Sequence, residues 1–175
     1  MAQASGNREF VRYTVMGAVC LAAVAGILAL QPGSVALGAL PPIRLQFDLD
    51  PLWRTSTLVQ VHVLTVFYAL ATGPLQFALP KGTRLHRMLG WSWVLAMAVT
   101  AVTSLFIRDI NDGRFSPIHL FSVWTLISLP IAVWLARIGH IRSHRATLIG
   151  LYIGLVIAGL LSIAPGRVVW DMFFG

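Results

Sequence analysis

The chain has 175 residues, of which 57% are hydrophobic and only 11% are charged, and its mean hydropathy is +0.79. Because soluble domains carry about 25% charged residues, this composition excludes an ordinary soluble enzyme, a disordered chain and a disulfide scaffold. It indicates an integral membrane protein. We attribute the net charge of +7 to basic residues that orient a membrane protein and not to nucleic-acid binding, and the single cysteine, Cys20, excludes an intrachain disulfide.

Five apolar runs contain no Asp, Glu, Lys or Arg, and each is about as long as the ~20 residues that cross a bilayer as a helix. They predict an all-α polytopic membrane protein with five transmembrane helices, which in chain order are Tyr13–Leu30, Thr57–Leu79, Leu89–Ile107, Ile118–Ala136 and Ala146–Ile163. The first run is interpreted as a true helix because it is longer than the ~7–15 apolar residues of a signal peptide. The long first loop contains the alternating segment 43–53, which predicts a short interfacial or extended piece.

Two stretches of the sequence repeat. Residues 61–68 (VHVLTVFY) resemble residues 118–125 (IHLFSVWT), and RLHR at 84–87 resembles RSHR at 142–145. These matches predict that residues 57–112 and 113–169 are two copies of a helical hairpin, related by a pseudo-two-fold axis along the membrane normal. We therefore expect a four-helix bundle over residues 57–175, and an N-terminal part, residues 1–56, with a peripheral first helix and the long outer loop.

Charge sets the expected orientation. Eight Lys and Arg residues fall on the side of the N-terminus, and five fall on the other side together with five aspartates. The positive-inside rule then predicts a cytoplasmic N-terminus and a periplasmic C-terminus. Tryptophans are expected at both interfaces, with Trp53 and Trp170 outside and Trp91, Trp93 and Trp134 inside.

Four histidines are the candidate functional residues. His62 and His119 lie near the outer ends of predicted spans, and the pseudo-symmetry sets them opposite each other, as it does His86 and His144 at the inner end. Because two histidines from facing helices can bind one haem iron, the pattern predicts two b-type haem sites. Arginine pairs with the haem propionates, so the candidate partners of the inner haem are Arg84, Arg87, Arg142 and Arg145, and those of the outer haem are Arg108, Arg114 and Arg167.

A structural role for the same histidines stays open. His62 and His119 are also explained as interhelical hydrogen bonds, and the small or polar stripe Thr65, Ala69, Gly73 and Gln76 beside His62 must face protein. We expect His86 and His144 in basic loops at the starts of their helices. There the positive-inside rule and the binding of anionic lipids explain the RLHR and RSHR motifs without any ligand role for the histidines. The two pairs are about 36 Å apart along the helices, so they cannot share one metal ion.

Four short stretches carry a resemblance: HRMLG at 86–90, FSPIHLFS at 115–122, SHR at 143–145 and PGR at 165–167. Together they resemble an uncharacterised bacterial family of small predicted inner-membrane proteins, a domain of unknown function, over about Val61 to Arg167. The resemblance implies a multi-helix bundle with these histidines in the bacterial inner membrane, and no activity. The paired layout is also similar to that of transmembrane two-haem cytochromes b, which is a likeness of fold alone.

The leading hypothesis is therefore a b-type haem protein that carries electrons across or within the bacterial inner membrane through two bis-histidine sites, with the lipid bilayer around it and a quinone or a redox protein as partner. One alternative is a non-catalytic accessory or assembly subunit, which binds partner membrane helices or forms a homodimer through Gly150 and Gly154. A second alternative is a permease for a small solute or an ion.

Overall fold

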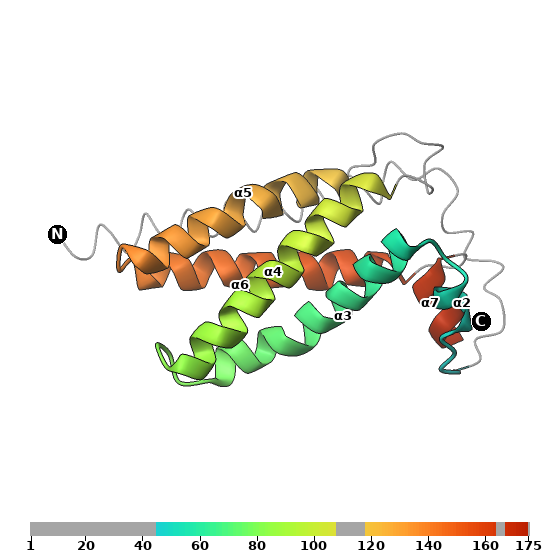
Figure 1. Ribbon diagram of the computed structural model, residues 1–175, viewed down its shortest axis with the longest axis horizontal. Coiled ribbons are helices and arrows are strands. Elements are labelled where there is room, and N and C mark those ends of the chain that lie inside the picture. The colour runs from blue at the N-terminus through green and yellow to red at the C-terminus, as the bar shows by residue number, and fades with distance from the viewer. Residues whose placement is uncertain (1–44, 108–117, 164–166, 175) are drawn as a thin grey trace.

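The computed structural model describes residues 45–107, 118–163 and 167–174. Within these ranges the chain is helical and has no strand, and four helices are long and apolar enough to cross a membrane (Figure 1). They are α3 (Thr57–Ala78), α4 (Arg84–Phe106), α5 (Ile118–Arg137) and α6 (Ile141–Leu161). The last four predicted spans are confirmed as helices, whereas the predicted span Tyr13–Leu30 lies outside the described residues.

Two of the helices begin earlier than the apolar runs predicted. Helix α4 begins at Arg84 because the Thr83 side chain accepts a hydrogen bond from the backbone N–H of His86 at 3.2 Å and caps the helix. Helix α6 begins at Ile141, after a turn in which Gly139 has a φ of 79°. His86 and His144 both belong to the first turns of these helices, so their expected position at helix starts is confirmed and their expected position in loops was wrong.

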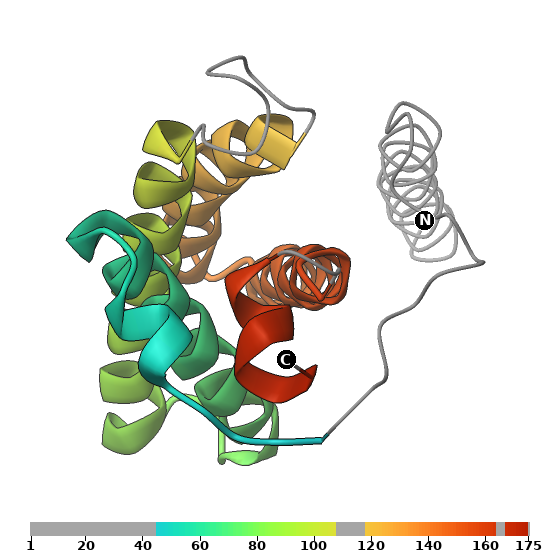
Figure 2. The same cartoon turned by 90° about the vertical axis from the view of Figure 1, so that its right-hand side faces the viewer.

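The long helices pack in chain order. Helix α3 packs most extensively on α4, α4 also packs on α5, and α5 packs on α6, while α3 and α6 share a smaller contact. Figure 2 looks at the bundle from the end that carries the short helices α2 (Asp50–Trp53) and α7 (Val168–Phe174). We call this the acidic end, because Asp48, Asp50 and Asp171 lie there, and we call the opposite end, with the α3–α4 and α5–α6 turns, the basic end.

Pro74 lies inside α3, and its missing N–H deprives the Leu70 carbonyl of its helical donor. The hydroxyl of Tyr152 on α6 donates to this carbonyl at 3.2 Å, and Nε1 of Trp93 on α4 donates to the adjacent carbonyl of Ala69 at 3.0 Å. Trp93 is thus a core residue, and its expected position at the interface was wrong. It lies two residues after the exposed Trp91, which puts the two rings on different faces of α4.

We expect Trp93→Phe to destabilise the bundle by about 1–3 kcal/mol, because the change removes the donor to the Ala69 carbonyl and leaves a gap in the core. Thermal unfolding in detergent micelles measures the effect. The matched control is Trp91→Phe on the exposed side of the same helix, where a change within about 0.5 kcal/mol is expected. Equal shifts for the two variants would contradict this assignment.

Candidate functional site

His62 stands on α3 near the acidic end, and its side chain points to α4. Its Nδ1 lies 3.1 Å from the Thr100 carbonyl oxygen and 3.0 Å from the Thr103 hydroxyl. Because a carbonyl only accepts, Nδ1 carries the proton; the Thr103 hydroxyl donates to the Val99 carbonyl at 2.7 Å and can accept from the ring. In the neutral ring, Nε2 therefore keeps its lone pair. Histidines that bind metals characteristically donate one N–H to a protein carbonyl or carboxylate in this way.

A cavity of about 100 Å³ lies among the four long helices, and His62 lines it. The other lining groups are mostly small or carry a hydroxyl, and they include Thr100, Ser104, Ser122, Thr125, Gly150, Gly154, Gly159 and Ser162. The Phe121 ring forms part of the wall and lies 3.8 Å from where a Cβ on Gly154 would be. The glycines of α6 thus provide a flat surface, and an aromatic ring covers part of it.

His119 lies in the first turn of α5, at the same end of the bundle as His62. Its side chain is only 6% exposed, so it belongs to the interior of the protein and does not face lipid. It is not among the described residues that line the cavity. The structure therefore brings His62 to the cavity and buries His119 at the same end of the bundle.

The polar stripe of α3 faces protein, as predicted. The Thr100 hydroxyl donates to the Thr65 hydroxyl at 2.8 Å, and Ala69 and Gly73 are buried. At the basic end, Nε2 of Gln76 donates to the His86 carbonyl at 3.2 Å. The stripe is the surface of α3 that packs on its neighbours.

The second pair of histidines lies at the basic end. Nδ1 of His144 is 2.8 Å from the Ala132 carbonyl of α5, so this ring also carries its proton on Nδ1 and keeps the Nε2 lone pair. Nδ1 of His86 is buried and has no hydrogen-bond partner among the described residues. The structure thus brings His86 and His144 to one end of the bundle.

The four arginines predicted as propionate partners of the inner haem are at the surface. Arg84, Arg87, Arg142 and Arg145 are all exposed. Nη1 of Arg87 donates to the Gly82 carbonyl at 3.0 Å, within its own turn. Arg167 precedes α7 and is half-buried, and this burial lowers the pKa of its guanidinium. Arg108 and Arg114 lie outside the part of the chain that the structure describes.

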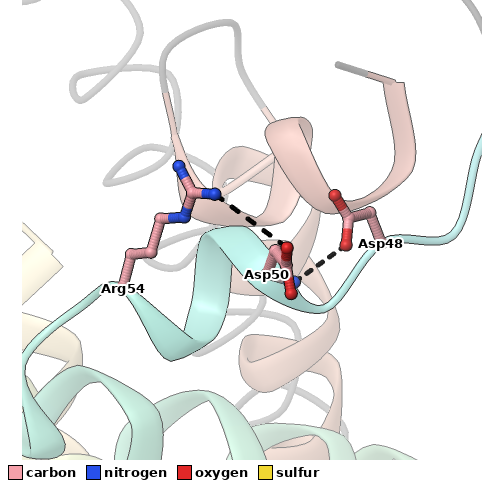
Figure 3. Close-up of polar contacts among 3 residues, drawn as sticks. All are labelled: Asp48, Asp50 and Arg54. Atoms are coloured by element: carbon pink, nitrogen blue, oxygen red, sulfur yellow. Dashed lines mark hydrogen bonds and ion pairs between the residues drawn. The ribbon is translucent and has the colours of Figure 1, made fainter.

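Helix α7 forms a cap with the segment before α2, which the sequence did not predict. The backbone N–H groups of Gln46 and Asp48 donate to the carbonyls of Phe173 and Met172 at 3.1 and 3.0 Å. The Asp48 carboxylate accepts from the Asp50 N–H at 2.9 Å, and Arg54 lies 3.9 Å from Asp50 (Figure 3). This ion pair is exposed, so it adds little stability. No signal in the sequence pairs these two distant segments.

An open hollow of about 430 Å³ lies beside the cap, and Asp48, Asp50 and Asp171 are among the residues that line it. The three carboxylates give this end of the bundle its negative charge. Across the described ranges, no group of three or more His, Cys, Asp or Glu side chains is arranged to hold a metal ion. A site for a bare metal ion therefore has no support in the described residues.

A family model described as "Predicted membrane protein (DUF2306)" matches residues 59–174. The expected membership of an uncharacterised family of membrane proteins is thereby confirmed, over a range that runs from the third residue of α3 through α6 and α7. Comparisons with curated proteins and with solved structures find no match.

Proposed function

Because the chain belongs to the DUF2306 family of predicted membrane proteins, whose description states no activity, we propose a function from the residues of the bundle. The bundle binds b-type haem through histidines at its two ends and carries electrons through the membrane. His62 and His119 hold the haem at the acidic end, and His86 and His144 hold the haem at the basic end. The two hairpins α3–α4 and α5–α6 are the repeats, related by a pseudo-two-fold axis.

The observation that carries this proposal is the hydrogen bonding of His62. Its Nδ1–H is directed to the Thr100 carbonyl, and its ring lines the cavity, which leaves Nε2 as the ligating atom. His144 repeats the arrangement in the second hairpin, with Nδ1–H directed to the Ala132 carbonyl. Two histidines, one from each hairpin and one at each end, are thus oriented by carbonyls of neighbouring helices.

The residues suit haem in their chemistry, although the cavity is small. Imidazole is a common axial ligand, and small residues on α6 offer a flat apolar surface for a macrocycle. The cavity of about 100 Å³ is smaller than the ~300–1,000 Å³ of pockets that hold small molecules. The Phe121 ring, which covers Gly154, would have to move to admit a porphyrin.

The chain's own groups have distinct parts in this proposal. Thr100 and Thr103 orient His62, and the Ala132 carbonyl orients His144. Arg167 pairs with a propionate at the acidic end, and Arg84, Arg87, Arg142 and Arg145 are the candidate propionate partners at the basic end. Haem, when bound, supplies reversible one-electron chemistry. A quinone or a redox protein would be its electron-transfer partner at the membrane surface.

The charges of the two ends support an orientation in the bacterial inner membrane. The basic end corresponds to the cytoplasmic side by the positive-inside rule, which gives a cytoplasmic N-terminus and a periplasmic C-terminus. The acidic end, with Asp48, Asp50 and Asp171, then faces the periplasm.

A second candidate is an accessory subunit in which the histidines only pack. The hydrogen bonds of His62 and His144 to carbonyls favour it, because these contacts join helices whether or not a metal is bound.

An absorption spectrum separates the two candidates. The full chain, purified from cells supplied with a haem precursor, is expected to have a Soret band and sharp visible bands after reduction by dithionite. A pyridine haemochromogen assay is expected to give up to two b-type haems per chain. If the protein purified from these haem-supplied cells is folded but colourless, the haem proposal is overturned and the accessory subunit is favoured.

A further inference from the structure

The basic end carries a positive charge that the described part of the protein does not neutralise. Six cationic side chains lie on its turns and on the adjoining helix ends, namely Lys81, Arg84, Arg87, Arg137, Arg142 and Arg145. Residues 79–91 and 134–146 contain no Asp or Glu. The acidic residues that the structure describes, Asp48, Asp50 and Asp171, are at the other end of the bundle. An external anion is the natural complement of this surface.

Three of the six cations already have partners within the protein. Nζ of Lys81 donates to the carbonyls of Gln76, Phe77 and Leu79 at 2.9, 2.7 and 2.9 Å, and so closes the end of α3. Arg87 donates to the Gly82 carbonyl, and the Arg137 guanidinium lies 6.0 Å from the centre of the Trp91 ring. These contacts explain the three side chains without any ligand.

The other three are Arg84, Arg142 and Arg145. All three side chains are exposed, and within the described residues they form no hydrogen bond or ion pair. They belong to the first turns of α4 and α6, which both begin at this end of the bundle. A planar guanidinium binds a phosphate through two parallel hydrogen bonds, so each of these arginines suits a phosphate.

Large apolar side chains are exposed next to these arginines. Met88 and Trp91 on α4 are 60% and 54% exposed, and Trp134 on α5 is 58% exposed. The contact of Arg137 with Trp91 brings the end of α5 to the first turns of α4, so the apolar side chains of both helices adjoin the same cationic surface. Exposed tryptophans of a membrane protein are typical of the depth at which headgroups meet acyl chains.

We propose that the basic end binds an anionic phospholipid. Arg84, Arg142 and Arg145 pair with headgroup phosphates, and the acyl chains lie along Met88, Trp91 and Trp134. The apolar surface favours a lipid over free phosphate, because phosphate alone makes no use of it. The positive charge of the basic end favours an anionic headgroup over a zwitterionic one, because the cation of a zwitterionic headgroup competes for its own phosphate. This inference concerns the haem-free chain, because a haem at the basic end would bring its propionates to the same arginines.

The test is lipid binding to the full chain, purified without haem in detergent and measured by native mass spectrometry. Phosphatidylglycerol is expected to bind more than tenfold more tightly than phosphatidylcholine. Arg142→Gln alone is expected to weaken phosphatidylglycerol about fivefold, and the triple variant R84Q/R142Q/R145Q is expected to abolish the preference. The matched control is Arg54→Gln, an exposed arginine at the acidic end, which is expected to change nothing.

Two outcomes would overturn the proposal. One is an undiminished preference for phosphatidylglycerol in the triple variant, or in the single variants if the triple variant does not fold. The other is release of bound phosphatidylglycerol by inorganic phosphate at equal concentration, which would identify a site for a free anion. The conservative variant Arg142→Lys keeps the charge but not the fork of donors, and it is expected to retain only part of the affinity.

Discussion

The variant His62→Gln is expected to lose the haem of the acidic end while it keeps the fold. A glutamine amide can donate to the Thr100 carbonyl, as Nδ1–H of His62 does, but it is a poor ligand for haem iron. The ratio of haem to protein is expected to fall by about one haem per chain, by the pyridine haemochromogen assay. Thermal unfolding of the haem-free protein is expected to change by less than about 1 kcal/mol.

The matched control for this variant is His140→Ala. His140 is exposed at the start of α6, and its side chain makes no capping hydrogen bond, so the haem content should stay at the wild-type level. His119→Gln is expected to behave as His62→Gln does. A folded His62→Gln protein with the full haem content would remove His62 from the site. If the haem-free His62→Gln protein is much less stable than the haem-free wild type, the loss of haem reflects a packing role of His62.

Gly73→Ala is expected to destabilise the bundle by about 1–3 kcal/mol, because a methyl group at this position would overlap the ring of Tyr152. The ring has little freedom to move away. Its hydroxyl donates to the Leu70 carbonyl at 3.2 Å, and the ring packs edge-to-face on Phe77 at 5.5 Å between centroids. Unfolding of the purified protein in detergent, followed by circular dichroism, measures the loss.

Gly90→Ala provides the control for Gly73→Ala. A Cβ on Gly90 meets Gln76 at 3.9 Å, which is an ordinary contact, and alanine favours the helix interior by roughly 0.5–1 kcal/mol. This variant is expected to be neutral or slightly more stable. A Gly73→Ala protein as stable as the wild type would mean that α3 and α6 are not packed closely at this point.

The sequence predicted the four described spans because hydropathy over some twenty residues reports directly on the bilayer. It predicted the starts of α3 and α5 to the residue and those of α4 and α6 less well. The Thr83 hydroxyl donates to the Pro80 carbonyl at 3.0 Å and accepts from the His86 N–H at 3.2 Å, so it ends one turn and begins α4. An average over an apolar run does not detect this local effect. The charged residues Arg84 and Arg87 also concealed the first turn of α4, since charge marks the end of a span and not the end of a helix.

The sequence predicted at which end of the bundle each histidine lies, but not which histidine ring faces the cavity. Spacing correctly indicated that His86 and His144 lie at one end and that His62 and His119 lie at the other. Which ring faces the cavity depends on rotamers and on partners such as Thr103, which no spacing specifies. The cap of α7 on the segment before α2 was missed for a related reason, because its hydrogen bonds join backbone groups more than a hundred residues apart.

The bond between Tyr152 and Leu70 has a consequence for biogenesis. The two residues are 82 positions apart, so α6 emerges from the ribosome long after α3 does. Until then the Leu70 carbonyl has no hydrogen-bond donor in the hydrocarbon, where an unsatisfied backbone group costs several kcal/mol. The nascent α3 must therefore stay beside the insertion machinery or beside water until α6 arrives, so its integration is completed only late in synthesis.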